Sequence, residues 1–246
     1  MRVLITNDDG IDSPGLAALA RAAVRHGWTA VVAAPAAEAS GTSAGLTAAQ
    51  DDRRIEVARR DLPDLPDVPC FAVAAHPGLI ALVASQGAFG DPPEVVLSGI
   101  NRGANVGRAV LHSGTVGAAL TASINGARAM AVSLDVGLDP DVEHHWATAA
   151  AVASGLFDRL AALPPGSVLN LNVPNRPEVG PPRRAGLADF GAVRSKLHDT
   201  DDGTISLAAV SVDEEPRPGS DAALLAEGHP TLTPLRSVSE DPDVEV

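Results

Sequence analysis

The chain has 246 residues and is poor in several residue types, and each shortage argues against a class of protein. Its single cysteine, Cys70, excludes an internal disulfide framework and a cluster of thiolate zinc ligands. No uninterrupted apolar run reaches the roughly 18 residues that a membrane-spanning helix needs. The N-terminus also lacks the apolar segment of a signal peptide. We therefore expect a cytoplasmic protein without a membrane partner.

Basic residues are scarce as well. Lys and Arg together number 18 against 31 Asp and Glu, so the net charge is −13, and Lys196 is the only lysine. That balance argues against binding of a nucleic acid polymer, which requires a basic surface. It does not exclude a small phosphorylated substrate, because a bound metal ion can reverse the local field.

Aromatic residues make up only 2% of the chain, so a core must be built from Ala, Val, Leu and Ile, and the apolar fraction of 45% is ample for one. The pattern predicts a strand over 3–5, a helix over 16–25 and a strand over 29–34, which together form a βαβ unit of a parallel sheet. Further predicted helices lie at 79–85, 115–127 and 146–163, and further strands at 94–97, 129–134 and 168–173. These alternating elements indicate an α/β fold.

The composition of the chain changes after Pro174, where many Pro and Asp residues interrupt the predicted elements. Two short β-like runs remain, at 205–212 and 231–235. We therefore divide the chain into a core of residues 1–174 and an irregular extension of residues 175–246. The extension is poor material for a separate core, and we expect a hairpin or arm that packs on the core or on a neighbouring subunit.

Four polar clusters stand at predicted strand ends: Asn7-Asp8-Asp9, the loop Ser40–Ser43, Asn101–Asn105 and Ser113-Gly114-Thr115. Each cluster alone could be an ordinary turn or helix cap. In open α/β sheets, however, ligands bind at the carboxyl ends of the strands. Four such clusters on one sheet edge therefore indicate a functional site.

The residue types in these clusters suit a particular chemistry. Adjacent carboxylates such as Asp8 and Asp9 repel each other, and a cation neutralises that repulsion. The segment Ser98–Gly107 contains three glycines, which let the backbone approach a ligand, and two Asn amides that can bind metal or phosphate. Ser113-Gly-Thr115 opens a predicted helix, and a helix N-terminus binds anions. A metal beside an anion site is the arrangement that metal-assisted phosphoryl chemistry needs.

Three segments, Thr6–Gly15, Ser98–Gly107 and Ser113–Ala119, resemble the SurE family of stationary-phase survival proteins. Members of that family are metal-dependent 5′(3′)-nucleotidases and acid phosphatases. The segments 168–174 and 231–235 are similar to later parts of the family, so the resemblance spans nearly the whole chain. It implies a Rossmann-like α/β core with a mostly parallel sheet, and an extension used in homodimers or homotetramers.

The resemblance implies one divalent cation per subunit, held by four oxygen ligands: Asp8, Asp9, Ser40 and Asn101. Hard oxygen donors favour Mg²⁺, Mn²⁺ or Ca²⁺ over zinc. A metal-activated water would attack phosphorus, with Asp8 and Asp9 as catalytic residues and Asp8 favoured as general base or acid. No covalent phospho-enzyme is needed.

The same motif match implies four phosphate-binding residues: Asn105, Ser113, Gly114 and Thr115. We also expect Asn7 and His112, which stand beside these motifs, to contact the substrate. His76 is a weaker candidate of the same kind, and as an isolated histidine it is more typical of a surface or core position.

The chain departs from the family around this shell. Ala36 and Ala37 stand where the family usually has Asp-Arg, and the segment 75–80 lacks the family's Gly-Thr-Pro-Ala-Asp-Cys pattern. His112 replaces a usual Tyr. The predicted metal-binding and phosphate-binding residues match the family, whereas the residues around them differ from it. Our hypothesis is therefore a phosphomonoester hydrolase whose substrate is not a common nucleotide.

Two other classes of protein fit this sequence poorly. A haloacid-dehalogenase-type phosphatase needs Asp-x-Asp after the strand and a downstream lysine, and a dinucleotide-binding protein needs Gly-x-Gly-x-x-Gly in the first turn. The remaining alternative is a non-catalytic SurE-like protein that binds a ligand or serves assembly. Metal-dependent turnover of a phosphoester discriminates between this alternative and the enzyme.

Overall fold

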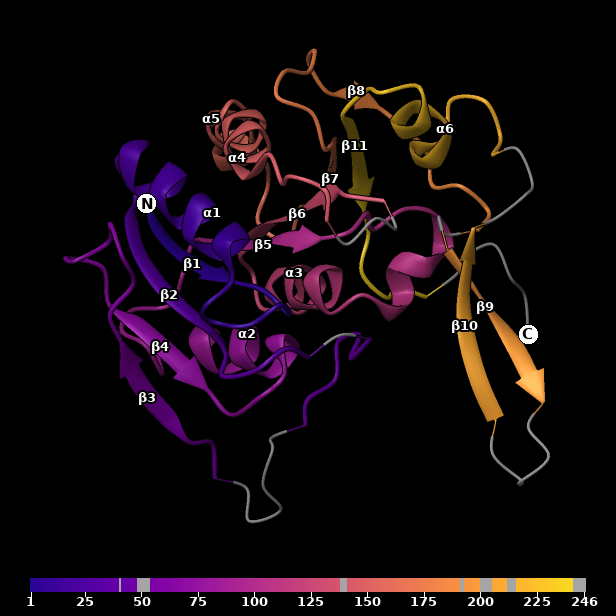
Figure 1. Ribbon diagram of the computed structural model, residues 1–246. Helices are drawn as coiled ribbons and strands as arrows, with labels where there is room; N and C mark the ends of the chain where they lie inside the picture. The colour runs from indigo at the N-terminus through magenta and orange to yellow at the C-terminus, as the bar shows by residue number, and fades with distance from the viewer. Residues whose placement is uncertain are drawn as a thin grey trace.

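The structure is a computed structural model that describes residues 1–39, 41–47, 54–137, 141–190, 193–199, 205–211 and 216–240. A nine-stranded sheet with the strand order β3-β4-β2-β1-β5-β6-β7-β11-β8 runs through it (Figure 1). Its strands are β1 (Arg2–Thr6), β2 (Thr29–Pro35), β3 (Val57–Arg60), β4 (Cys70–Val73), β5 (Val95–Arg102), β6 (Arg128–Asp135), β7 (Val168–Pro174), β8 (Arg183–Arg184) and β11 (Thr231–Leu235). The neighbouring strands from β4 to β7 all run parallel, which confirms the predicted α/β class with a mostly parallel sheet.

Helices cover both faces of the sheet (Figure 1). One face carries α1 (Pro14–Arg25), α4 (Trp146–Ser154) and α5 (Phe157–Ala162), and the other carries α2 (Pro77–Ser85) and α3 (Gly114–Ile124), which follows the 3₁₀ helix η1 (Gly107–His112). Both buried layers consist mainly of Ala, Val, Leu and Ile, as the composition predicts. Within the part of the chain that the structure describes, no helix is both long and apolar enough to cross a membrane.

The first turn of α1 touches two other elements. A Cβ added to Gly15 would overlap the carbonyl oxygen of Ile100 in β5 and would lie 3.1 Å from Cζ3 of Trp146 in α4. Only glycine lets α1, β5 and α4 meet at this point.

The prediction of a single helix over 146–163 is wrong, because Gly155 and Leu156 separate α4 from α5. Ala153 before the break and Phe157 after it are both fully buried in the same core. The apolar period therefore reports the buried side of this segment correctly, but it does not reveal the interruption. Glycine lowers helix stability by about 1 kcal/mol relative to alanine, and here it marks the helix end.

The C-terminal part of the chain extends the sheet and adds a hairpin. β11 pairs antiparallel with β7, β8 pairs with β11, and α6 (Asp221–Ala226) lies between them in sequence. β9 (Val193–Asp199) and β10 (Ile205–Ser211) pair antiparallel with each other and stand apart from the large sheet (Figure 1). The division of the chain at residue 174 and the use of the extension in homodimers or homotetramers stay predictions.

Candidate functional site

Three segments meet at the carboxyl ends of β1 and β5. The two strands are parallel neighbours with Thr6 opposite Ser98, so the turn after β1 and the end of β5 lie on the same sheet edge. The N-terminus of α3 reaches this place too, because Thr115 Oγ1 donates a hydrogen bond to Asp8 Oδ1. That bond joins the first polar cluster of the sequence to the last.

Asn7 holds the turn that follows β1. Its Nδ2 donates to the Gly10 carbonyl over 3.0 Å, and the Gly10 N–H donates to its Oδ1 over 3.2 Å. The side chain is fully buried. Because both amide atoms are used inside the turn, Asn7 fixes how Asp8 and Asp9 leave the strand. Its contact with a substrate stays a prediction.

Asp8 is a carboxyl group almost removed from water, with 6% of its surface exposed. Burial raises the pKa of Asp8 above its ordinary value, and the hydrogen bond from Thr115 opposes that shift. Gly114 lies directly against this carboxyl group, since a Cβ there would be 2.8 Å from Asp8 Oδ2. Glycine at this position lets the start of α3 approach Asp8.

Asp9 is the partly buried neighbour of Asp8. The backbone N–H of Arg102 donates to Asp9 Oδ2 over 3.1 Å. Burial, and after it the negative charge of Asp8, raises the pKa of Asp9 to about 6. Two carboxyl groups in one desolvated place disfavour each other's ionisation, and a bound cation offsets that repulsion.

Asn101 comes to the site from an irregular end of β5. The register between β5 and β6 shifts between Gly99 and Asn101, and such bulges change the direction of a side chain. Asn101 Nδ2 donates to the Gly103 carbonyl over 2.8 Å, so Oδ1 is the amide atom suited to a cation. The next residue, Arg102, bonds to Asp9. β5 therefore brings Asn101 beside the carboxyl pair.

The donor set of this sheet edge fits a hard divalent cation. Asp8, Asp9 and Asn101 offer carboxylate and amide oxygens, which Mg²⁺, Mn²⁺ and Ca²⁺ prefer. The described residues contain no group of three or more His, Cys, Asp or Glu that could hold a metal. A cation here would therefore depend on two carboxylates and neutral oxygens. Ser40, the fourth predicted ligand, lies outside the described residues.

The N-terminus of α3 offers donors to an anion. Ser113 is the N-cap, and its Oγ accepts a hydrogen bond from the Val116 N–H over 3.1 Å. The N–H groups of Gly114 and Thr115 begin the helix and have no intrahelical acceptors. Both hydrogen-bond to the Asp8 carboxylate instead. The helix dipole adds partial positive charge at the same place. The predicted anion site thus lies directly beside the predicted metal site.

Asn105 is bound to β6 and β7. Its backbone N–H donates to Asn172 Oδ1 over 2.8 Å, and its Nδ2 donates to Ser133 Oγ over 2.9 Å. Its carbonyl accepts hydrogen bonds from Nδ2 of both Asn170 (2.8 Å) and Asn172 (2.9 Å). The main chain and side chain of Asn105 are therefore held in one conformation.

Sequence reasoning missed Asn170, Asn172 and Ser133 as supports of the site. All three are fully buried. A signal was present in the strand itself, because Asn is disfavoured in strands and a buried amide needs hydrogen-bond partners. Two Asn residues at alternate positions of an aliphatic strand indicate that one face of β7 binds something polar.

The two histidines that flank these motifs both lie near one loop. His112 is exposed at the end of η1, directly before the N-cap of α3. His76 is the N-cap residue of α2, and its N–H donates to the Thr47 carbonyl over 3.3 Å. The loop that contains Thr47 also bonds η1, through Ser43 Oγ and the Leu111 carbonyl at 2.6 Å. Contact of either histidine with a substrate stays a prediction.

Comparisons with known proteins bear on the family and the fold. The family model described as "Survival protein SurE" matches residues 3–188. A protein named 5′-nucleotidase SurE from Solidesulfovibrio magneticus is 37% identical over 243 residues, covering 96% of this chain and 91% of that protein. Another of the same name from Xanthomonas campestris is 40% identical over 177 residues, covering 71% and 64%. The crystal structure of the SurE protein from Aquifex aeolicus is similar with a TM-score of 0.77 at 26% identity, covering 98% of this chain and 95% of that one.

Proposed function

This chain belongs to the SurE family, and from that premise we propose that it is a phosphomonoester hydrolase of the 5′-nucleotidase type. The proposed reaction is metal-dependent hydrolysis of a small phosphorylated substrate. The names of the relatives support the reaction type. The observation that carries the proposal is the junction at Asp8, where a desolvated carboxyl pair meets the N-terminus of α3 through Thr115.

The cation would be held by Asp8, Asp9 and Asn101, with Ser40 added by motif match. When bound, such a cation supplies a Lewis acid and activates a water for attack on phosphorus. Its oxygen ligands favour Mg²⁺, Mn²⁺ or Ca²⁺, one per subunit.

The chain's own groups bind and orient the phosphate. The N–H groups of Gly114 and Thr115 hydrogen-bond to the Asp8 carboxylate in this structure. We propose that they would donate to phosphate oxygens when a phosphate is present, which would place phosphorus beside the carboxyl pair. Asn105, held by β6 and β7, would bind the same group from another side. Asp8, which accepts the Thr115 hydroxyl and lies against the start of α3, would be the group placed to take or return the proton of the reaction.

We further propose that the substrate differs from common nucleotides. The residues that depart from the family lie near the site: His112 directly precedes Ser113, and the segment with Ala36 and Ala37 passes the first turn. The Ala39 N–H at the end of that segment donates to the Asp8 carbonyl over 2.8 Å. Changes at these positions alter what borders the substrate and leave the carboxyl pair in place.

The decisive experiment measures p-nitrophenyl phosphate hydrolysis with and without Mn²⁺ or Mg²⁺. We expect turnover that needs the metal and is lost in Asp9→Asn, an isosteric change that removes one negative charge. Asp67→Asn removes the same charge from an exposed loop and should keep wild-type activity. A folded wild-type protein that is inactive with both metals would contradict the proposal and favour the non-catalytic alternative.

The substrate is tested with a panel of phosphomonoesters under the conditions that give turnover. We expect at least one ester without a purine or pyrimidine base to have a higher kcat/KM than AMP or GMP. AMP and GMP as clearly the best substrates would contradict the changed specificity, and they would leave the hydrolase proposal intact.

A further inference from the structure

The C-terminal part of the chain contacts the segment before α3 through one buried acidic residue, Asp221. Asp221 is the first residue of α6 and is fully buried. The N–H of Gly107, the first residue of η1, donates to Asp221 Oδ2 over 2.9 Å. The two residues are 114 positions apart in the sequence. This bond therefore ties α6 to the segment that runs from Asn105 to the start of α3.

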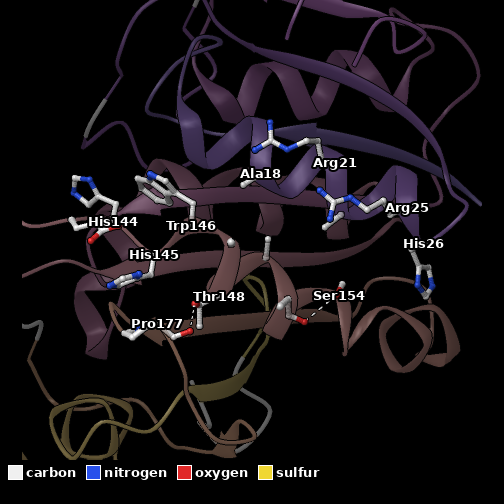
Figure 2. Close-up of a pocket in the computed structure, with 15 residues that line it drawn as sticks. Ala18, Arg21, Arg25, His26, His144, His145, Trp146, Thr148, Ser154 and Pro177 are labelled. Atoms are coloured by element: carbon white, nitrogen blue, oxygen red, sulfur yellow. Dashed lines mark hydrogen bonds between the residues drawn. The ribbon is translucent and has the colours of Figure 1, made fainter. Parts of the chain in front are cut away.

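The contact lies on the side of the sheet that carries α3. Val110 of η1 and Leu187 both pack in the apolar layer on that side. A groove of about 790 Å³ between α1 and α4 lies on the opposite side (Figure 2). The sheet separates that groove from the start of α3, whereas α6 is bonded to the segment that leads into α3.

Backbone N–H groups satisfy the carboxyl group of Asp221. Besides Gly107, Ala188 and Ala222 each donate to Oδ1 over 2.8 Å. Among the described residues, Asp221 forms no ion pair. Hydrogen bonds to a charged acceptor are about twice as strong as neutral ones, and here they offset the cost of burying the charge. Loss of the charge would therefore weaken all three bonds together.

Capping of α6 does not require this carboxyl group. Ser220 is already the N-cap residue, and its Oγ accepts the Ala223 N–H over 3.3 Å. Asp221 adds a connection among α6, the loop with Ala188 and the start of η1. The Ala188 carbonyl also accepts the Arg108 N–H over 3.1 Å, which holds the same loop against η1.

Gly107 shows how closely these segments meet. Its φ is +62°, a conformation that favours glycine, and a Cβ there would overlap the carbonyl oxygen of Phe190. The same Cβ would lie 3.0 Å from the Ala188 carbonyl oxygen. The backbone of η1 therefore rests directly on the loop that Asp221 holds.

Both ends of η1 continue into predicted phosphate-binding residues. Asn105, held by β6 and β7, is two residues before Gly107, and Val106 between them is buried. At the other end, the Ser113 N–H donates to the Val110 carbonyl over 3.2 Å, and Ser113 caps α3. A displacement of Gly107 would therefore change the spacing between Asn105 and the start of α3.

We propose that Asp221 is a positioning residue of the candidate site. Its carboxyl group fixes η1, and through η1 it sets the distance between Asn105 and the N–H groups of Gly114 and Thr115. The inference rests on the proposed function, because these groups matter as ligands of a substrate phosphate. Asp221 acts on that phosphate only through Gly107 and η1.

The isosteric variant Asp221→Asn tests the proposal, since it removes the charge and places an amide N–H₂ against at least one of the three N–H donors. We expect KM for p-nitrophenyl phosphate and Kd for inorganic phosphate, both with Mn²⁺, to rise about tenfold, the equivalent of about 1.4 kcal/mol. The value of kcat should stay nearly unchanged, as for a loss of binding that ground state and transition state share. Unchanged KM and Kd would overturn the proposal, and so would a fall in kcat alone.

Ser220→Ala is the matched control at the neighbouring position. It removes the cap of α6 and leaves the bond between Asp221 and Gly107 in place. Urea unfolding should show a loss of stability, while KM and Kd stay at their wild-type values. A rise in KM equal to that of Asp221→Asn would show that only the stability of α6 matters, and it would overturn the proposal.

The wild-type protein provides a test that does not depend on the folding of a variant. Coupling is reciprocal, so if the Gly107 contact favours phosphate binding, phosphate must stabilise that contact. Hydrogen exchange at the N–H groups of Gly107 and Ala188 should slow when inorganic phosphate binds with Mn²⁺. Unchanged exchange despite bound phosphate would overturn this proposal alone. A wild-type protein that neither binds phosphate nor hydrolyses the ester would contradict the proposed function as well.

Discussion

The two halves of the candidate site are built on opposite principles. The carboxyl half, Asp8 and Asp9, is desolvated, negatively charged and self-repelling, and both pKa values are raised. The amide half, Asn105 and the start of α3, is neutral. Asn105 donates hydrogen bonds to Asn172 and Ser133, and Ser113 caps α3 by accepting the Val116 N–H. The first half destabilises the metal-free fold, whereas the second half stabilises it.

This difference shows which half of the site depends on a ligand and which half is formed without one. A buried carboxyl pair without a cation disfavours ionisation. The hydrogen bonds among Asn105, Asn170 and Asn172 hold the amide half without a phosphate, although Asn170 Oδ1 has no partner among the described residues. We therefore expect mutations in the carboxyl half to remove activity without loss of stability, and mutations in the amide half to reduce both.

The largest effect is expected for Asp8→Asn. The amide still accepts the hydrogen bond from Thr115, but the negative charge is lost, so we expect kcat/KM to fall about a thousandfold, the equivalent of several kcal/mol. Steady-state kinetics with Mn²⁺ measure this fall, and thermal unfolding in EDTA should show no loss of stability. Asp67→Asn is the charge-matched control. If Asp8→Asn keeps an activity within tenfold of wild type, Asp8 is not a catalytic residue.

A smaller loss is expected for Thr115→Val, which tests the bond that joins the two halves. Removing the hydroxyl deprives Asp8 of its donor, and loss of such a supporting group lowers activity about 10- to 100-fold. Thr115→Ser keeps the hydroxyl and should recover most of kcat/KM. If Thr115→Val and Thr115→Ser have the same kcat/KM, the hydrogen bond does not position Asp8.

In the amide half, Asn172→Leu should lower the free energy of unfolding by about 1–3 kcal/mol. The change leaves the partly buried N–H of Asn105 without its acceptor, and an unsatisfied donor removed from water costs free energy of this size. Urea unfolding measures the loss. Asn125→Ala removes an exposed amide that bonds the Thr121 carbonyl at the far end of α3, and should have a smaller effect. Equal losses would show that Asn172 has no special role.

The smallest effect concerns pH and the carboxyl half. The pKa of Asp9 is raised from 3.8 to about 6 in the folded state, so its contribution to stability is fully present below pH 3.8 and is lost as the pH rises through about 6. In EDTA, the stability difference between Asp9→Asn and wild type should therefore grow by about 1 kcal/mol between pH 4 and pH 7, a value reduced for partial exposure. A difference that stays constant with pH would show that Asp9 is not desolvated.

The turn after β1 and the cap of α3 could be predicted because their signals are local. An apolar run followed by Asn-Asp-Asp-Gly marks a strand end, and Ser113 precedes a helix at the N-cap position. α1 begins at Pro14, two residues before the predicted start, as is common for proline in a first helical turn, and its N-cap residue, Ser13, makes no side-chain capping bond.

The supports of the site could not be predicted, because their contacts are distant in sequence. Asn105 and Asn172 are separated by 67 residues, and no local pattern pairs them. The edge strand Val57–Arg60 was missed for a different reason: all four residues are exposed, so it lacks the alternation of buried and exposed positions that identifies a strand. Ser40 and its ligand role stay a prediction.

The contact at Gly15 connects the packing of α1 and α4 with the strand that carries Asn101. The first turn of α1 rests on the Ile100 carbonyl and on Trp146 with no side chain between them, and Ile100 directly precedes Asn101. A side chain at position 15 would therefore displace the strand that carries Asn101 or separate α1 from α4. By this contact, the packing of two helices on one face of the sheet sets the position of a predicted cation ligand at its edge.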